Sequence, residues 1–199
     1  MPNDCPDLTA LLGSRICHDL ISPLGAIGNG VELLSMAGTA AGPEMALIAE
    51  SVASAKARIR FFRIAFGAAA PDHRLGRPEI LAVIADMTRG GKLVIDWQPE
   101  GDEARRTVKL AFLGLQCLES ALPWGGRITV QQLGPTWVLR AEALRVKADP
   151  ALWAVLAGQG NPAEVSPAQV HFALMPVEAA RQNRQLQADL TETEISLRF

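Results

Sequence analysis

The sequence has few cysteines, no long apolar run and almost no net charge. Its three cysteines, Cys5, Cys17 and Cys117, are odd in number and widely spaced, which excludes a disulfide framework and a zinc-binding pattern. No apolar run approaches about eighteen residues, and the acidic amino terminus lacks the basic flank of a signal peptide, so we expect a cytoplasmic protein with no membrane segment. The net charge of -2 predicts no general affinity for nucleic acid.

What the sequence does contain is a histidine set inside an amphipathic helical pattern. Apolar residues recur every three to four positions at Leu12, Ile16, Leu20, Leu24, Ile27, Val31 and Leu34. His18 falls off this stripe. Its neighbours on the helical face are mostly polar: Ser14, Arg15, Ile21 and Ser22. We therefore expect an exposed imidazole, which is a nucleophile near neutral pH. Because adjacent helical residues point about 100° apart, Cys17 is not expected to form a catalytic pair with His18.

The residues after His18 oppose helix formation. Pro23 removes a backbone donor at a cost of about 3 kcal/mol, and each glycine costs roughly 1 kcal/mol relative to alanine. The glycines are Gly25, Gly28 and Gly30. A kink with small residues would bare one helical face for another protein to approach. The alternative is a short helix that ends near Ser22, with the glycines in a loop, although the apolar spacing continues to Leu34.

A second helix is predicted from Pro43, with the apolar positions Met45, Ile48, Val52, Ala55, Ile59, Phe62 and Phe66. The small residues 37–42 would form the turn of an antiparallel hairpin. One hairpin cannot cover two apolar stripes, so we expect a homodimer that closes a four-helix bundle. Lys56, Arg60 and Arg63 form a basic strip, with Arg58 displaced around the helix. This strip is either a solvated face or a contact for an anionic partner.

These residues carry a resemblance. The run H-D-L-I-S-P-L, from His18 to Leu24, resembles the H-box of two-component histidine kinases. The longer stretch 14–34 is more similar still to the alphaproteobacterial ChpT family of histidine phosphotransferases. The resemblance implies that His18 accepts a phosphoryl group and that the hairpin dimerises. It also implies that the rest of the chain is a degenerate ATPase-like domain.

The remainder of the chain reads as an α+β sandwich with helices on one face of a mostly antiparallel sheet. We expect 1–70 to be the hairpin, 71–77 a linker with an exposed His73, and 78–199 the sandwich. Helices are predicted at 78–88, 103–122, 149–157 and 167–182, the last interrupted by Pro176. Strands are predicted at 92–98, 127–133, 137–146, 186–190 and 194–199.

The ATPase domains of histidine kinases carry an asparagine box in the long helix and an Asp-x-Gly-x-Gly loop. Here no asparagine occurs between Asn29 and Asn161, and Asp149 is followed by Pro150. After Asp149, the only Gly-x-Gly sequence is at residues 158–160. This is a weak signal for phosphate binding, because it lacks the lysine, serine and strand context of a phosphate-binding loop. We therefore expect no ATP binding and no cofactor of the chain's own. Because function belongs to sites rather than folds, the sandwich can persist without the nucleotide site.

An acceptor histidine without a nucleotide site predicts a phosphorelay shuttle. His18 would take the phosphoryl group from a receiver domain and pass it to the aspartate of a response regulator, with Mg²⁺ supplied by the receiver domain. Asp19 would orient the imidazole or accept its proton, unless it only faces solvent. Ser14, Arg15, Ser22 and Pro23 would line the docking surface. The resemblance implies a hybrid kinase of the CckA type and regulators of the CtrA and CpdR type, in cell-cycle control.

Two other classes compete with this interpretation. A His-Asp doublet also occurs in metal-dependent phosphohydrolases, which need further histidines that converge on the metal. The remaining histidines are His73, in the expected linker, and His171, which we expect to be a core residue. The second alternative is a docking module for response regulators that performs no chemistry at His18.

Overall fold

The computed structural model describes residues 8–36 and 42–199. Contacts divide the chain into two compact units: Met1–Ala68 with Ala82–Met87, and Ala69–Leu81 with Thr88–Phe199. We call the first the hairpin unit and the second the sheet unit. The predicted turn at 37–42 lies outside the described residues except for its last position. In the described part of the chain, no helix has the length and apolar character needed to cross a membrane.

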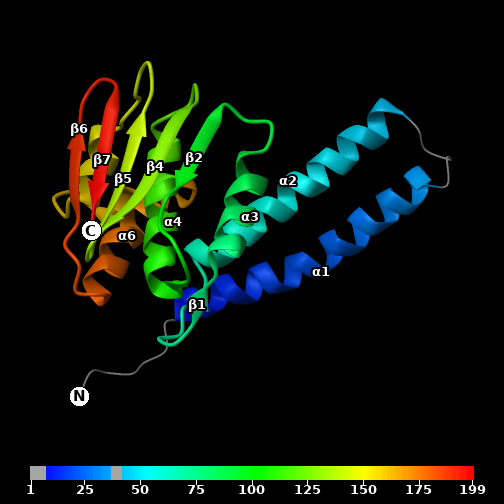
Figure 1. Cartoon of the computed structure of the whole chain (residues 1–199), viewed down its shortest axis with the longest axis horizontal. Coiled ribbons are helices and arrows are strands. Elements are labelled where there is room, and N and C mark those ends of the chain that lie inside the picture. The colour runs from blue at the N-terminus through cyan, green and yellow to red at the C-terminus, as the bar shows by residue number, and fades with distance from the viewer. Residues whose placement is uncertain (1–7, 37–41) are drawn as a thin grey trace. The chain divides into compact units, whose positions relative to one another are not determined.

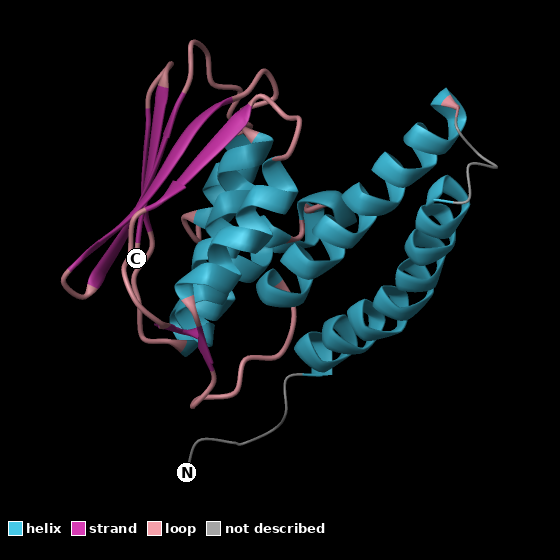
Figure 2. Ribbon diagram, turned by 45° about the vertical axis from the view of Figure 1, so that its right-hand side comes forward, coloured by secondary structure: helices cyan, strands magenta, loops and turns pink. Residues whose placement is uncertain are grey.

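The hairpin unit is built on two long antiparallel helices, α1 (Leu8–Met36) and α2 (Pro43–Ala65), which run side by side in Figures 1 and 2. α1 continues through Pro23 and all three glycines, so the continuous helix is confirmed and the alternative end near Ser22 is wrong. α2 begins with proline at its first position, where the missing N–H is not needed, as predicted.

Two glycines of α1 let the helices approach closely. A Cβ at Gly13 would lie 3.2 Å from the carbonyl oxygen of Phe66, and one at Gly28 would overlap the ammonium of Lys56. A Cβ at Gly25 or at Gly30 would meet no other atom within 4 Å. Gly28 therefore lies in the contact between α1 and α2. The prediction that it lies on an uncovered docking face is wrong.

The buried face of α2 differs from the predicted stripe at its carboxyl end. Phe61 is buried, whereas Phe62 is only partly buried. Adjacent apolar residues satisfy the helical pattern equally well, so the sequence alone could not choose between them. The buried residues of α2 are Val52, Ala57, Ile59, Phe61, Ile64 and Ala65.

The sheet unit contains a five-stranded sheet in the order β2-β4-β5-β7-β6. Its strands are β2 (Leu93–Trp97), β4 (Gly126–Leu133), β5 (Thr136–Glu142), β6 (Gln187–Leu190) and β7 (Glu194–Arg198). β2 pairs parallel with β4, and the other pairs are antiparallel. α4 (Arg105–Ser120) and α6 (His171–Arg181) cover one face, as Figures 1 and 2 show. The predicted α+β sandwich is confirmed.

Shorter elements complete the sheet unit. They are β1 (Arg74–Leu75), β3 (Glu103–Ala104), α5 (Pro150–Leu156) and 3₁₀ turns at Pro162–Glu164 and Pro167–Gln169. α3 (Arg77–Thr88) begins here, and its residues Ala82–Met87 belong to the hairpin unit. β1 lies inside the segment predicted as a linker, and it pairs with β3, which lies at the start of the helix predicted at 103–122. A two-residue pairing is too short to leave a sequence pattern.

Two predictions for this unit are wrong in detail. β5 ends at Glu142 instead of Val146, because the ladder with β7 stops at the pair Glu142 and Glu194. α6 begins at His171 after a 3₁₀ turn and runs through Pro176 without interruption. Pro176 deprives the helix of only the bond to the carbonyl of Phe172, and the rest of α6 retains its ladder.

The core of the sheet unit lies between the helices and the sheet. Twelve residues of α4 are buried. Gly114 brings this helix close to its neighbours, since a Cβ there would lie 2.9 Å from Leu139 and 3.2 Å from Met175. Lys109 and Glu178 form a buried ion pair at 3.3 Å between α4 and α6. This unit has its own hydrophobic core and a satisfied charge pair inside it.

Candidate functional site

His18 lies on an exposed part of α1, as the sequence predicted, while the adjacent Cys17 is buried. Burial raises the pKa of the Cys17 thiol, and the positive charge of Arg63 lowers it in part. The thiol is therefore protonated near neutral pH, which fits a packing role. For four other candidate residues, α1 fixes the backbone position and their side chains lie outside the described part of the structure: Ser14, Arg15, Asp19 and Pro23.

The face of α1 around His18 is small and polar. At 100° per residue, Ser22 lies about 40° from His18, and Gly25 and Asn29 lie about 20° from it. Ser22 and Asn29 are exposed, and the space beside Gly25 is open. Helical spacing of seven and eleven residues could have identified Gly25 and Asn29 from the sequence. A partner surface could reach the imidazole along this face, which we call the His18 face.

The opposite side of α1 carries an apolar row. Ile16, Leu20, Ile27 and Leu34 lie about 160° to 180° from His18 on the helix. Their exposed fractions are 51%, 46%, 51% and 48%. Leu24 and Val31, also predicted on the buried stripe, are partly buried. The predicted stripe therefore separates into a partly buried portion and an exposed apolar row within the single chain.

The basic strip on α2 makes different contacts along its length. The ammonium of Lys56 packs against Gly28 of α1. Arg60 forms an ion pair with Asp86 of α3 at 3.3 Å, a partner 26 residues away that helical spacing does not reveal. Arg63 is exposed and acts electrostatically on Cys17. Arg58 is exposed on another side of α2. Arg63 is thus linked to the residue next to His18, whereas Lys56 contacts α1 further along at Gly28.

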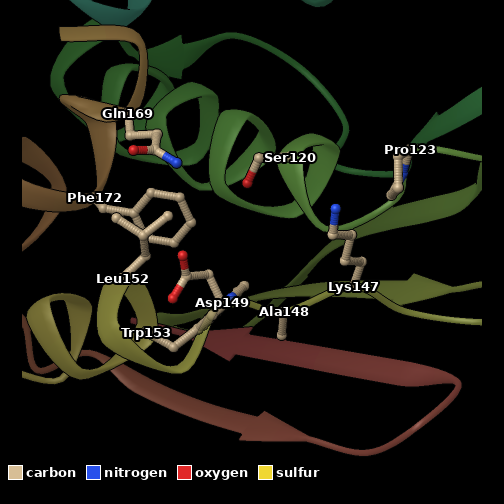
Figure 3. A pocket seen from close by; sticks show the side chains of 9 residues that line it. All are labelled: Ser120, Pro123, Lys147, Ala148, Asp149, Leu152, Trp153, Gln169 and Phe172. Atoms are coloured by element: carbon tan, nitrogen blue, oxygen red, sulfur yellow. The ribbon is translucent and has the colours of Figure 1, made fainter. Parts of the chain in front are cut away.

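The sheet unit contains a pocket of about 390 Å³ (Figure 3). Its lining includes the aromatic rings of Trp153 and Phe172, with Lys147, Asp149 and Gln169 among its polar groups. The Asp149 carboxylate accepts a hydrogen bond from the amide of Ala151 at 3.0 Å and so caps α5. This carboxylate therefore has a structural role within the lining of the pocket.

The Gly-x-Gly at 158–160 is explained by the end of α5. Gly158 has a φ of +73°, and its amide donates to the carbonyl of Val155 at 3.0 Å. A Cβ at Gly160 would lie 2.6 Å from the amide nitrogen of Val155. These glycines let the chain turn back against α5, which accounts for the motif without a ligand.

The remaining histidines lie in the sheet unit. His73 is exposed, and His171 is only 5% exposed, so the predicted core histidine is confirmed. Burial lowers the pKa of His171 to about 4. Its Nε2 has no hydrogen-bond partner among the described atoms, and its ring packs 4.9 Å from Phe172. Across residues 8–36 and 42–199, no group of three or more histidine, cysteine or carboxylate side chains is placed to hold a metal ion.

The chain combines a helical hairpin that carries an exposed histidine with an α/β sandwich, and comparison with known proteins places it in the class of histidine phosphotransferases. The family model of the histidine phosphotransferase C-terminal domain matches residues 77–194. Protein phosphotransferase ChpT of Brucella abortus (strain 2308) is 35% identical over 184 residues, which cover 87% of each chain. A 1.7 Å structure of a bacterial phosphotransferase matches with a TM-score of 0.68 and 27% identity, covering 100% of this chain and 98% of the other.

The chain therefore belongs to the ChpT family of histidine phosphotransferases. The resemblance inferred from residues 14–34 is confirmed over most of the chain, and the role of the protein is phosphotransfer. The family relation also indicates interaction with kinases and response regulators.

Proposed function

We propose that His18 is the phosphoacceptor of a phosphorelay shuttle. The observation that carries this proposal is the position of His18 on an exposed, small and polar helix face, with the apolar row on the opposite side. Protein surfaces can thus reach the imidazole without displacing the residues that pack the hairpin. Phosphoryl transfer needs positioning and charge stabilisation more than covalent help, so an exposed helix face suffices.

In the first step, Nε2 of the neutral imidazole attacks the phosphorus of a receiver's phosphoaspartate in line. The N–P bond forms as the acyl phosphate O–P bond breaks, and the aspartate leaves as a carboxylate. In the second step, the carboxylate of a response regulator attacks the phosphohistidine and restores the neutral imidazole. Asp19 would orient the ring through Nδ1–H, and Mg²⁺ would come with each receiver domain.

The partners follow from the family. We propose that the donor is a hybrid kinase receiver domain of the CckA type and that the acceptors are CtrA and CpdR type regulators in cell-cycle control. Ser22 and the backbone around Ser14, Arg15 and Pro23 would contact them. The chain's own ATP binding is not expected, because α4 contains no asparagine and the Asp149 carboxylate already caps α5.

The active form would be a homodimer. Ile16, Leu20, Ile27 and Leu34 form a row with spacings of four, seven and seven residues, and about half of each side chain is exposed in the single chain. Leu47 and Ile48 of α2 are also exposed, by 65% and 45%. Pairing two hairpins through these residues would bury both sets in a four-helix bundle and leave the His18 faces outward.

Transfer from a labelled donor tests this function. The purified receiver domain of a CckA-type kinase is phosphorylated with ³²P, separated from its kinase and mixed with the full chain. We expect acid-labile label on the wild type, none on His18→Gln, and undiminished label on His73→Gln, a matched exposed histidine. Equal labelling of His18→Gln and the wild type would contradict the shuttle. Receiver binding without any transfer would favour the docking module.

A further inference from the structure

The geometry of the hairpin singles out Arg63 among the basic residues of α2. Lys56 and Arg63 are seven residues apart, so they lie on the same side of α2 and are two turns apart. Lys56 points to α1, because its ammonium packs against Gly28. In an antiparallel pair, two turns forward along α2 correspond to two turns back along α1, to about Ile21. Arg63 is therefore directed at the turn of α1 that contains Cys17, His18 and Ile21.

A second contact confirms this register. Gly13 lies against the carbonyl of Phe66, and Gly28 lies against Val52 as well as Lys56. Interpolation between these two contacts also places His18 opposite the last turns of α2, near Arg63. The electrostatic effect of Arg63 on Cys17, the residue next to His18, agrees with this placement. Arg60 in the same strip is held by Asp86 instead.

A phosphoryl group on His18 would add about two negative charges at this level of the hairpin. The guanidinium has a planar fork of N–H donors that matches phosphate oxygens, and it remains charged at every relevant pH. Arg63 is exposed, so a phosphoryl group beside it would not have to enter the packed core of the hairpin.

We propose that Arg63 is a positioning residue that stabilises the phosphoryl group carried by His18, within the same chain. This inference rests on the proposed function for the presence of that group, and it changes the expected role of Arg63 from partner contact to charge stabilisation. The competing role is a cation in the last turn of α2, which stabilises the helix end whether or not His18 is phosphorylated.

Phosphoramidate, a small-molecule phosphoryl donor, allows a test without any partner. The full-length protein is phosphorylated with it, and the phosphohistidine is followed by ³¹P NMR from pH 5 to 9. A cation about 6 Å away in a water-like dielectric lowers the midpoint of the phosphoryl titration by about 0.5 pH unit. We expect Arg63→Gln to raise the midpoint by about that amount and Arg63→Lys to keep most of the wild-type value.

Arg58→Gln is the matched control, because Arg58 is exposed on another side of the same helix. It should leave the midpoint unchanged, and circular dichroism should show equal helicity for all variants. The proposal is overturned if Arg63→Gln titrates like the wild type, or if Arg63→Lys shifts as far as Arg63→Gln. A role limited to the helix end would change helicity or melting temperature and leave the titration in place.

The role of Arg63 and the phosphorelay role of the protein can fail independently in these experiments. If phosphoramidate labels His18 and Arg63→Gln shifts the titration while no phosphorylated receiver transfers label, the relay fails and the role of Arg63 stands. If receivers transfer normally and the titration of Arg63→Gln is unchanged, the relay stands and the role of Arg63 fails.

Discussion

The hairpin unit and the sheet unit solve the burial of apolar residues in different ways. In the sheet unit, twelve of the sixteen residues of α4 are buried, and even a lysine and a glutamate are paired inside it. In the hairpin unit, α1 leaves an apolar row about half exposed on one side and His18 exposed on the other. A chain can thus combine a unit with a filled core and one that leaves apolar side chains and a histidine exposed.

The largest expected effect follows from placing a charge in the apolar row. Ile27→Glu should dissociate the proposed dimer, because each lost buried side chain would cost about 2 kcal/mol and the proposed dimer would contain two. The dissociation constant should therefore rise by about a thousandfold. Light scattering after gel filtration measures the mass. Asn29→Glu, on the His18 face, is the control and should remain dimeric. A dimeric mass for Ile27→Glu would contradict the proposal that the apolar row pairs two hairpins.

A single methyl group should damage the sheet unit. Gly125 has a φ of +92°, and a Cβ there would lie 2.5 Å from the carbonyl oxygen of Lys92. Backbone strain and the close contact together should make Gly125→Ala less stable by about 3 kcal/mol. All four tryptophans lie in this unit, so urea unfolding followed by tryptophan fluorescence reports it alone. Wild-type stability in Gly125→Ala would contradict the turn geometry, whereas labelling of its His18 by phosphoramidate should survive.

Acid should weaken the sheet unit through His171. Its imidazole stays neutral in the folded protein down to a pKa of about 4, whereas the unfolded chain binds a proton near 6.5. The unfolded state therefore takes up protons first, and stability falls as the pH decreases from 6.5 to 4. At pH 5 the loss relative to pH 7.5 should be about 2 kcal/mol. His171→Phe should show a smaller loss over this range, and His73→Gln the same loss as the wild type.

The smallest effect concerns a glycine of the hairpin. The space beside Gly30 is open, so Gly30→Ala adds a methyl group without a clash. Alanine favours the helix by about 1 kcal/mol over glycine, and the hairpin should melt later by circular dichroism while the fluorescence transition of the sheet unit stays unchanged. A lower melting temperature of the hairpin would contradict the open space beside Gly30 and indicate a packing role in the proposed dimer.

Much of the fold could be predicted because the elements are long and regularly patterned. Both hairpin helices, the long helix α4 and the strands of the sheet follow from apolar spacing, and the exposure of His18 follows from its place off the stripe. Local pattern could not decide between Phe61 and Phe62, because both are apolar and adjacent. It also missed β1 with β3, since two residues are too few to show alternation.

The contacts of the basic strip depend on tertiary structure. Helical spacing groups Lys56, Arg60 and Arg63 together, yet the fold gives them three different neighbours: Gly28, Asp86 and the turn that contains Cys17. Asp86 belongs to α3, a helix whose packing on the hairpin leaves no trace in the spacing of α2. The sequence could therefore predict that a basic surface exists, but not which of its residues lies near the turn that contains Cys17.

The central claim is that His18 carries the phosphoryl group in transit. The direct measurement is mass spectrometry at neutral pH of the full chain after transfer from a phosphorylated receiver domain, with ³¹P NMR to identify the ring nitrogen. We expect one phosphoryl group per chain, attached to Nε2 of His18 and released when a second receiver domain is added. Phosphate on another residue, or a His18 that stays unmodified while the receiver loses its phosphate, would contradict it.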